Sequence, residues 1–578
     1  MKVHYYGPNI DWSEEKLIDQ LLHPPTNMIA IDTETVSLTD RTMLGFGIAI
    51  NPNEAYYIPV WPERSEILES VYHLLTRVDI FKLGHNINFD ISVLRQFAVS
   101  EGYPYCDVTN THDTSTIANI SALDPDLHTL ALKHTKLNLD FFTIQDILQS
   151  ARESTGKRSV NMTDADPDQI ALKCANDVRA TYALWEPLVN QMNTNMWDCY
   201  QVDRELLGIL KTVERKGLAL NQNKLYERYK ELLAQLELYE DWGNDNGFSI
   251  SSPTQVGMFL GYNNIVLPTT RSGKQLDTSE EILQRFNTNP LVRNILEYRK
   301  LAKVKSTYVE PFIGKDRFYT HFRLDLATGR LASGGEKCLD HICSNGQNIP
   351  ANLRDMFTPD SGIYSWADMS QLEMRVFAYL SQDKALLELY KTNQSVHNDT
   401  FKIFYPDKPR YKEDGKDSDY YTKAKVGNFT MIFDGQDSTI ASQCEIPVLE
   451  AKRFRQIWFA RHPDAKLWME SKQNTGSTYE ETIFGRRMRI PPDYERGKSH
   501  SNKCRINYPV QGSGADLNKR ALLMLYKKGY LSDLRLQVHD ELLNDGIEFY
   551  DNFPHELVSN IHPDIYVPWE VSKGEVWI

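Results

Sequence analysis

The chain has 578 residues, of which 41% are hydrophobic and 25% are charged, a balance typical of soluble globular proteins with about three or four domains. Its net charge of −14, from 64 basic and 78 acidic residues, excludes a uniformly basic surface that wraps nucleic acid, but not a local basic cleft. No apolar run approaches the roughly 20 residues of a membrane span, and no signal-peptide pattern opens the chain. The seven cysteines are odd in number and show no disulfide-framework spacing, which suits a reducing cytoplasm. We therefore expect a cytoplasmic protein without membrane contact.

Residues 1–190 alternate between predicted strands and helices, an α/β pattern with carboxylates near the strand ends. Asp32 and Glu34 follow an apolar strand, Asp90 begins a helix after a later strand, and Asp177 lies on a late helix. Such groups can converge at one edge of the sheet. Four carboxylates could hold two divalent ions about 3.5–4 Å apart, which would cleave a phosphodiester. Taken singly, each aspartate is better explained as a helix cap or a solvated residue.

The spacing of these carboxylates resembles the proofreading 3′–5′ exonuclease domain of A-family DNA polymerases, an RNase H-like fold. The resemblance rests on the Asp-x-Glu after a strand, the run from Asn86 to Asp90, and the late Asp177. It implies two divalent ions in this domain. The family's tyrosine four residues before the last aspartate is Lys173 here. Because that tyrosine orients the attacking water in the family, we expect weak hydrolysis.

Residues 191–320 are strongly helical, and the helix near residues 295–308 carries several basic side chains close together. A solvated charged face explains these charges by itself. The segment also resembles the thumb of A-family polymerases, which grips duplex DNA by its backbone without reading sequence. The resemblance implies that Lys303, Ser306 and Thr307 contact DNA.

Residues 321–384 begin the palm in this comparison. The run from Tyr364 reads as a short apolar strand that ends on Asp368, followed by the first turn of a helix. A strand-end carboxylate can hold Mg²⁺ together with substrate phosphates, although alone it is equally well a helix cap. The resemblance assigns Glu373 as a gate that excludes a 2′-hydroxyl. It also assigns nucleotide or DNA contacts to three further residues of the palm: Arg330, Arg354 and Gln371.

Residues 385–500 are the predicted fingers. Lys425, Phe429 and Phe433 are four apart and share one helical face, which suits a triphosphate and a base, although aromatic stripes are usually core. The Lys-x-x-x-Phe run matches the nucleotide-binding helix of the family, and His397 matches a phosphate-contacting histidine.

Departures from the family occur on the same predicted helix. Tyr421 stands where the family has an arginine, and Thr430 replaces a glycine. Lys423 or Arg410 could take over the phosphate contact. Phenylalanine rather than tyrosine at 429 predicts poor use of dideoxynucleotides.

Residues 501–578 close the palm. Asp540 and Glu541 lie between apolar residues, which suits a tight hairpin aimed at the same metal as Asp368. The resemblance implies that His539, at that hairpin, contacts DNA, and that two residues before it read the minor groove: Asn507 and Gln511.

The ordered set Asp-x-Ser-x-x-Glu, Lys-x-x-x-Phe and His-Asp-Glu is identified as that of an A-family DNA polymerase with right-hand palm, fingers and thumb. The resemblance implies primer extension with two Mg²⁺ held by Asp368 and Asp540, with primer-template DNA, deoxynucleotides and replisome accessory proteins as partners of a monomer. No flap-nuclease segment precedes residue 1, so we expect a phage-type enzyme in the host cytoplasm.

Three alternatives to a DNA polymerase remain. They are a nuclease whose second half only holds duplex, a noncatalytic DNA-binding subunit, and a single-subunit RNA polymerase. Asp368 and Asp540 argue against the first two, and Glu373 with the exonuclease-like domain argues against the third.

Overall fold

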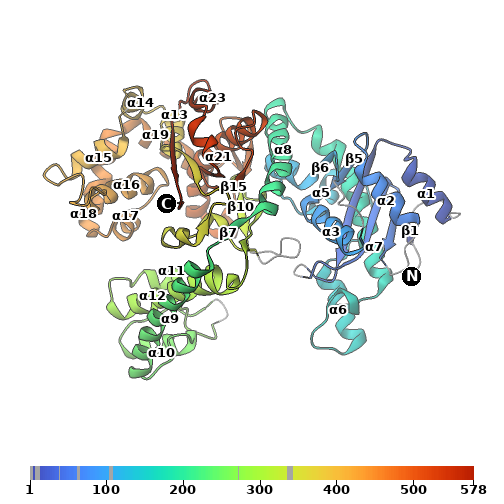
Figure 1. Cartoon of the computed structure of the whole chain (residues 1–578), viewed down its shortest axis with the longest axis horizontal. Helices are drawn as coiled ribbons and strands as arrows, with labels where there is room; N and C mark the ends of the chain where they lie inside the picture. The colour runs from blue at the N-terminus through green and yellow to red at the C-terminus, as the bar shows by residue number, and fades with distance from the viewer. Residues whose placement is uncertain are drawn as a thin grey trace.

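The structure is a computed structural model. It describes residues 4–6 (backbone only), 13–37, 40–60, 66–102, 108–270, 273–334, 343–392 and 394–577. Figure 1 shows an N-terminal α/β lobe in blue beside a larger lobe that contains a central sheet. A green helical body lies below this sheet, and orange helices lie on the side away from the blue lobe. Within the described segments, no helix combines the length and apolar character needed to span a bilayer. The multidomain α/β architecture expected from the sequence is confirmed.

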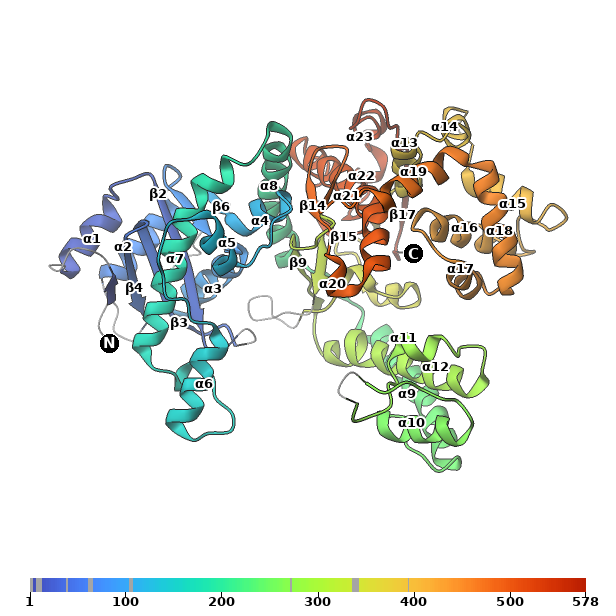
Figure 2. The same cartoon turned by 180° about the vertical axis from the view of Figure 1, so that it is seen from behind.

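The N-terminal lobe is built on a six-stranded mixed sheet of order β1-β4-β3-β2-β5-β6, in which only the β2–β5 and β5–β6 pairs are parallel. Its strands are β1 (His4–Tyr6), β2 (Met28–Thr35), β3 (Met43–Asn51), β4 (Glu54–Pro59), β5 (Phe81–Gly84) and β6 (Thr111–Asp113). Its helices are α1 (Glu14–Leu22), α2 (Glu66–Thr76), α3 (Ile87–Ser100), α4 (Thr114–Ile120), α5 (Leu127–His134), α6 (Ile144–Thr155) and α7 (Pro167–Val189). Figures 1 and 2 show α2 and α7 on opposite faces of the sheet.

The green helical body has its own hydrophobic core. Its helices are α9 (Gln222–Asp245), α10 (Pro253–Tyr262), α11 (Glu280–Gln284) and α12 (Pro290–Val304), and buried residues from Leu236 to Tyr298 form one cluster. The preceding helix α8 (Thr194–Lys216) buries Leu206 and Leu210 in the large core around the central sheet. Helix α8 therefore packs with the central sheet, although residues 191–320 were expected to form one helical body.

The central sheet has four antiparallel strands in the order β15-β16-β12-β17. They are β12 (Tyr364–Met369), β15 (Leu534–Val538), β16 (Glu541–Asp545) and β17 (Trp569–Gly574). The helices α13 (Leu372–Ser381) and α21 (Lys498–Lys527) pack against each other beside this sheet. Smaller elements complete the lobe: β7 (Leu218–Leu220), β8 (Arg317–Phe318), β9 (His321–Arg323), β10 (Ala332–Gly334), β11 (Phe357–Thr358), β13 (Tyr479–Glu481), β14 (Arg487–Arg489), α20 (Asp493–Arg496), α22 (Glu548–Asp551) and α23 (His555–Ser559).

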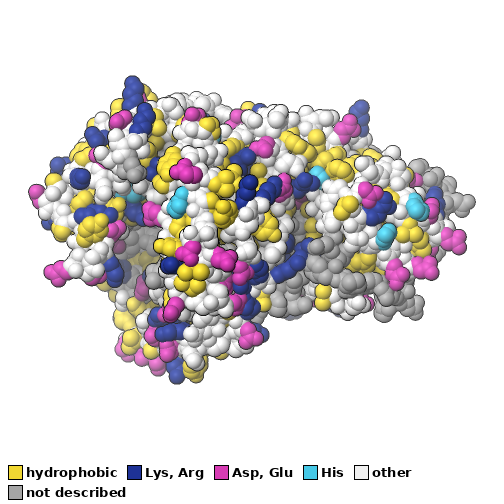
Figure 3. All heavy atoms as spheres, turned by 45° about the horizontal axis from the view of Figure 1, so that its top comes forward, with side chains coloured by type: hydrophobic (Ala, Val, Ile, Leu, Met, Phe, Trp, Pro, Cys, Tyr) yellow, Lys and Arg dark blue, Asp and Glu magenta, His cyan; other side chains and the backbone are white. Residues whose placement is uncertain are grey.

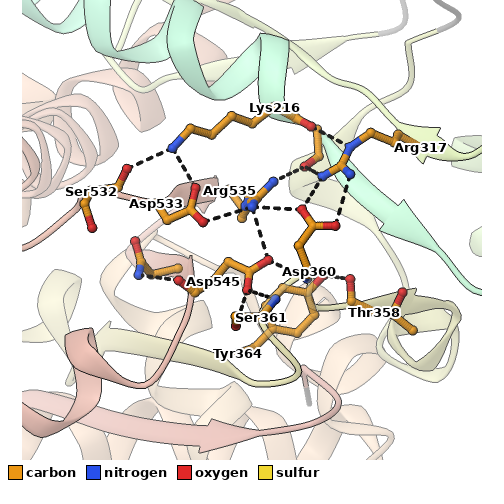
Figure 4. Close-up of polar contacts among 12 residues, drawn as sticks. Lys216, Arg317, Thr358, Asp360, Ser361, Tyr364, Ser532, Asp533, Arg535 and Asp545 are labelled. Carbon is orange, nitrogen blue, oxygen red and sulfur yellow. Dashed lines mark hydrogen bonds and ion pairs between the residues drawn. The ribbon is translucent and has the colours of Figure 1, made fainter.

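An ionic cluster fixes one end of the central sheet (Figure 4). Arg535 on β15 lies 2.9 Å from Asp360, 2.9 Å from Asp533 and 3.3 Å from Asp545. Arg317 on β8 also pairs with Asp360, at 2.7 Å. The cluster joins β8 to the β15–β16 hairpin, at the end of β12 that lies opposite to Asp368. These ion pairs hold the hairpin in register.

The orange helices form the remaining body, the predicted fingers. They are α14 (Lys384–Lys391), α15 (Val396–Phe404), α16 (Asp419–Ile432), α17 (Asp437–Cys444), α18 (Val448–Arg461) and α19 (Pro463–Asn474). Most of their buried hydrophobic residues belong to the same cluster as the central sheet, while Phe401, Tyr421 and Ala424 form a small cluster of their own. On the face drawn in Figure 3, acidic and basic side chains are interspersed, as the modest negative net charge allows.

Acid should weaken this fold through Glu214 on α8. The Glu214 carboxylate accepts hydrogen bonds from the Phe322 N–H at 2.7 Å and from Lys211 at 2.9 Å. Burial opposes its charge, but Lys211 and His321 outweigh burial and lower the pKa of Glu214 from 4.5 to about 2. Because the folded pKa is the lower one, this stabilisation is complete above about pH 4.5 and is lost as pH falls toward 2; the shift corresponds to about 3 kcal/mol.

We therefore expect Glu214→Gln to lower the free energy of unfolding by about 3 kcal/mol at neutral pH and by much less near pH 2. Urea denaturation of both proteins across this pH range measures the difference. If Glu214→Gln lowered the free energy of unfolding by the same amount at every pH, the role given to Glu214 would be contradicted.

Candidate active sites

Asp368 and Asp540, 172 positions apart in the sequence, meet at one end of the central sheet. Asp368 lies near the end of β12 and pairs in register with Glu541, the first residue of β16. Asp540 occupies the turn before it, where His539 has a left-handed φ of 54°. The Met369 N–H donates to the Asp540 carbonyl at 3.2 Å. The strand end and the hairpin expected from the sequence therefore lie side by side.

The carboxylates at this end are electrostatically crowded. Burial, followed by the charges of Asp540, Glu541 and Glu570, raises the pKa of Asp368 to about 8. Burial also raises the pKa of Asp540. Lys425 lowers both values, but not enough to offset burial. Such a cluster of hard oxygen ligands favours a divalent cation, which would stabilise the charged forms.

A cleft of about 320 Å³ opens beside Asp540. Six residues expected from the sequence line it: Arg330, Glu373, Phe429, Gln511, His539 and Asp540. Arg330 forms an ion pair with Glu373 across the cleft wall. The cleft thus combines a carboxylate, an aromatic ring and polar side chains from the central sheet, α13, α16 and α21.

Three further polar lining residues were not among the expected site residues: Asn518, Lys519 and Gln537. The Gln537 amide donates to Asn518 at 3.2 Å and accepts from Gln347 at 2.8 Å. A sequence signal existed for Asn518, because Asn507, Gln511, Gly514 and Asn518 recur at helical spacing on α21. Asn507 has a buried side-chain oxygen without a hydrogen-bond partner.

Some expected site residues lie beside the cleft, not on its wall. Glu541 accepts a hydrogen bond from Trp577 at 2.9 Å and lies 3.8 Å from Arg354, whose guanidinium stacks on the Trp577 ring. Gln371 has a left-handed φ of 54°, and its side chain accepts from the Tyr390 hydroxyl at 3.4 Å. These residues tie the end of the sheet that carries Asp368 and Asp540 to α13, α14 and the Trp577 region.

The helix α16 presents the predicted nucleotide-binding residues unequally. Lys425 is exposed and Phe429 lines the cleft. His397, on α15, is buried 5.4 Å from the Phe429 ring; its Nδ1 contacts Asn428, and its Nε2 has no hydrogen-bond partner. Phe433 is the C-cap of α16 and packs against the large core, outside the cleft lining. Helix α16 ends at Ile432, one residue before Phe433, so Phe433 does not share the helical face of Lys425 and Phe429 as predicted.

The residues expected to grip duplex lie at the C-terminal end of α12 and directly after it. Lys303 and Ser306 are exposed, and the Thr307 carbonyl accepts from the Ser344 hydroxyl at 3.1 Å. Ser306 and Thr307 belong to a π-helical turn, residues 305–309, that leads from the separate helical body into the large core, and Lys303 lies just before this turn.

A second acidic cluster lies in the N-terminal lobe. Asp32 and Glu34 come from β2, Asp90 from α3 and Asp177 from α7. The Asp90 carboxylate accepts from the Thr33 N–H at 2.9 Å and from the Thr33 hydroxyl at 2.7 Å. Burial raises the pKa of Asp90 to about 7 and raises that of Asp32 well above its usual range. The structure thus brings together all four carboxylates expected from the sequence.

Lys173 enters this cluster from α7. Its ammonium lies 2.7 Å from Glu34 Oε1 and 2.9 Å from Asp177 Oδ2. Burial would lower the pKa of Lys173, but Glu34, Asp177 and Asp32 hold it well above its usual value. Conversely, Lys173 and His128 outweigh burial and keep the pKa of Asp177 low.

Two family models match the chain. A 3'-5' exonuclease model covers residues 11–193, and the model of DNA polymerase family A covers residues 216–564, more than half of the chain. This chain belongs to DNA polymerase family A. The two acidic clusters lie one in each matched segment.

Relatives of this family A chain include DNA polymerase I of Pseudomonas aeruginosa, 28% identical over 95% of this chain and 63% of the relative. DNA polymerase I of Chloroflexus aurantiacus is 27% identical over 96% of this chain and 61% of the relative. This chain thus spans less than two thirds of their length. The solved POL domain of Pol1 from M. smegmatis in complex with DNA primer-template and dNTP shares the fold, with a TM-score of 0.71, 20% identity and 95% coverage of both chains.

The departures from the family A pattern on α16 have local structural solutions. The Arg410 guanidinium stacks 3.1 Å from the Tyr421 ring centroid, and its Nε donates to Asn398 at 3.0 Å. Lys423 instead donates to the Glu445 carbonyl at 3.2 Å. Thr430 is buried, and its hydroxyl donates to the Val426 carbonyl at 2.8 Å. Arg410 therefore occupies the neighbourhood of the missing arginine.

Proposed function

We propose that this chain is a template-directed DNA polymerase that adds deoxynucleotides to a primer 3′ end. The observation that carries the proposal is the meeting of Asp368 and Asp540 beside a cleft lined by Phe429, Glu373 and Gln511. The relatives are named DNA polymerase I, and the structural neighbour holds primer-template DNA and dNTP. These names support DNA and deoxynucleotides as partners.

Polymerase and exonuclease domains of this family generally use divalent metals, and the carboxylates near the cleft fit Mg²⁺ in chemistry and charge. Asp368 and Asp540 would hold two Mg²⁺, with Glu541 beside them. Bound there, the ions supply Lewis-acid stabilisation of the attacking 3′-oxygen and of the leaving pyrophosphate. The exposed Lys425 ammonium adds positive charge beside the phosphates and can donate a proton to the leaving group.

The nucleotide's other contacts follow from the cleft. Phe429 offers a flat wall to the base and sugar, and Glu373, held by Arg330, fills the space that a 2′-hydroxyl would need. His397 Nε2 is free to contact a phosphate. Burial, and then the charges of Lys425 and Arg410, lower the pKa of His397 to about 4. Arg410, which stacks on Tyr421, would take the phosphate contact of the missing arginine.

The remaining assignments extend the same proposal. Residues 1–190 are the exonuclease-like domain, 191–320 the thumb (with α8 packed on the palm), 321–384 and 501–578 the palm, and 385–500 the fingers. The duplex would run from the thumb to the palm, contacting seven residues: Lys303, Ser306, Thr307, Arg354, Asn507, Gln511 and His539. The protein acts as a cytoplasmic monomer, with accessory replication proteins as further partners.

A primed template with Mg²⁺ tests this function in one assay that scores both lengthening and shortening of the primer. We expect lengthening with deoxynucleotides and little with ribonucleotides. Shortening alone would identify a nuclease, binding without either reaction a noncatalytic subunit, and equal use of ribonucleotides an RNA polymerase.

Phe429 should set the discrimination against dideoxynucleotides. Phe429→Tyr adds a hydroxyl beside the sugar, which can replace a hydrogen bond that the missing 3′-hydroxyl would make. One such bond is expected to raise the use of dideoxynucleotides relative to deoxynucleotides by about tenfold to a hundredfold. Competitive primer extension measures the ratio. Phe459→Tyr, on α18, is the matched control, and an equal change in both variants would refute the assignment of Phe429.

A further inference from the structure

The acidic cluster of the N-terminal lobe already contains a cation, Lys173. Its side chain is 12% exposed, and its ammonium bridges one oxygen of Glu34 and one of Asp177. The other oxygen of Asp177 is 3.2 Å from His128 Nε2. One Asp90 oxygen is occupied by its two hydrogen bonds from Thr33. The carboxylates are therefore not equally available to metal ions.

A divalent ion cannot share the position between Glu34 and Asp177 with this ammonium. Mg²⁺ lies about 2.0–2.1 Å from its oxygen ligands, so an ion bound to both carboxylates would occupy nearly the same volume as Lys173 Nζ. The like charges would also repel each other strongly in a buried site. The opposite side of the cluster is different, because Asp32, Glu34 and Cys174 present ligand atoms within 4.8 Å of one another.

We propose that Lys173 is a built-in replacement for one of the two divalent ions expected in this cluster, so that the N-terminal lobe binds a single ion on the side of Asp32. The four carboxylates therefore do not fit a two-ion site as long as Lys173 is in place. The lobe retains the shape of a 3′–5′ exonuclease but hydrolyses primer ends slowly. This inference does not depend on the proposed polymerisation, because it concerns a separate cluster in a separate lobe.

Counting bound Mn²⁺ on the full chain tests the proposal. Lys173→Met removes the charge and keeps an unbranched, flexible side chain. We expect this variant to bind one more Mn²⁺ per chain than wild type by electron paramagnetic resonance titration. Removal of primer 3′ nucleotides should accelerate by about tenfold or more. Lys173→Arg retains a cation and should keep the wild-type count. Lys157→Met, which removes a lysine paired with Asp164 in the same lobe, is the matched control.

An equal Mn²⁺ count in wild type and Lys173→Met would overturn the proposal. If Lys173→Met is unfolded without metal, circular dichroism decides: recovery of the fold on adding Mn²⁺ supports the replacement of the ammonium by an ion. A chain that stays unfolded with Mn²⁺ overturns it, because Lys173 would then be required for packing and not as a substitute cation.

Discussion

Asp540→Ala should abolish primer extension in a protein that stays folded. The Asp540 backbone carbonyl, which accepts from Met369, is unchanged by the substitution, so only the carboxylate is lost. A metal ligand that stabilises the transition state contributes several kcal/mol, and a loss of about 4 kcal/mol slows extension about a thousandfold. Because Asp540 raises the pKa of Asp368 by repulsion, its removal should leave the melting temperature equal or higher.

Single-turnover extension of a labelled primer, followed by a thermal melt of the same sample, measures both effects. Glu570→Ala is the matched control, since Glu570 is an exposed carboxylate paired in register with Asp368 on β17. It should retain most of the extension rate. Removal of primer 3′ nucleotides should be the same in Asp540→Ala and wild type. Extension by Asp540→Ala within tenfold of wild type, or equal loss of both reactions, would contradict two independent sites.

Asp203→Ala should produce the largest loss of stability. Asp203, on α8, is fully buried and accepts hydrogen bonds from Arg486 at 2.8 and 3.0 Å and from Lys519 at 2.7 Å. Without Asp203, these two buried cations would share only Asp516, which lies 2.8 Å from Arg486. Breaking a buried pair in this way costs about 3–5 kcal/mol. Because Lys519 lines the cleft beside Asp540, the proposed primer extension should slow as well.

Urea denaturation measures this loss, and Asp198→Ala is its control. Asp198 lies on the same helix and pairs with Arg520 at 2.6 Å, but its side chain is 59% exposed. Exposed pairs contribute about 0–1 kcal/mol, so Asp198→Ala should be nearly neutral. Similar midpoints for the two variants would show that the Asp203 cluster does not hold α8 against the palm.

The sequence predicted the parts of the sites that depend on local pattern. An apolar run ending on Asp368 and an acidic pair between apolar residues at Asp540 specify a strand end and a hairpin, and the structure brings them together. The i, i+4 spacing of Lys425 and Phe429 correctly placed both on one helix. The same spacing failed for Phe433, because α16 ends at Ile432 and Asp434 turns left-handed at φ 56°.

Contacts between residues far apart in the sequence could not be predicted from local sequence patterns. The apolar stripe of α8 shows that one face of this helix is buried, but not that it packs on the core around the central sheet. Asp203 pairs with residues 283 and 316 positions away, which no spacing rule relates. Lys173 was recognised as a departure, yet a long flexible side chain can point in many directions, and only the structure shows its ammonium between Glu34 and Asp177.

Metal binding by both Asp368 and Asp540 is tested most directly by anomalous diffraction from a crystal of the protein with primer-template DNA, a nonhydrolysable deoxynucleotide and Mn²⁺. We expect two manganese peaks beside the triphosphate, with carboxylate oxygens of both Asp368 and Asp540 in their coordination shells. Manganese held by only one of these aspartates, or located away from both, would contradict a shared metal site of Asp368 and Asp540.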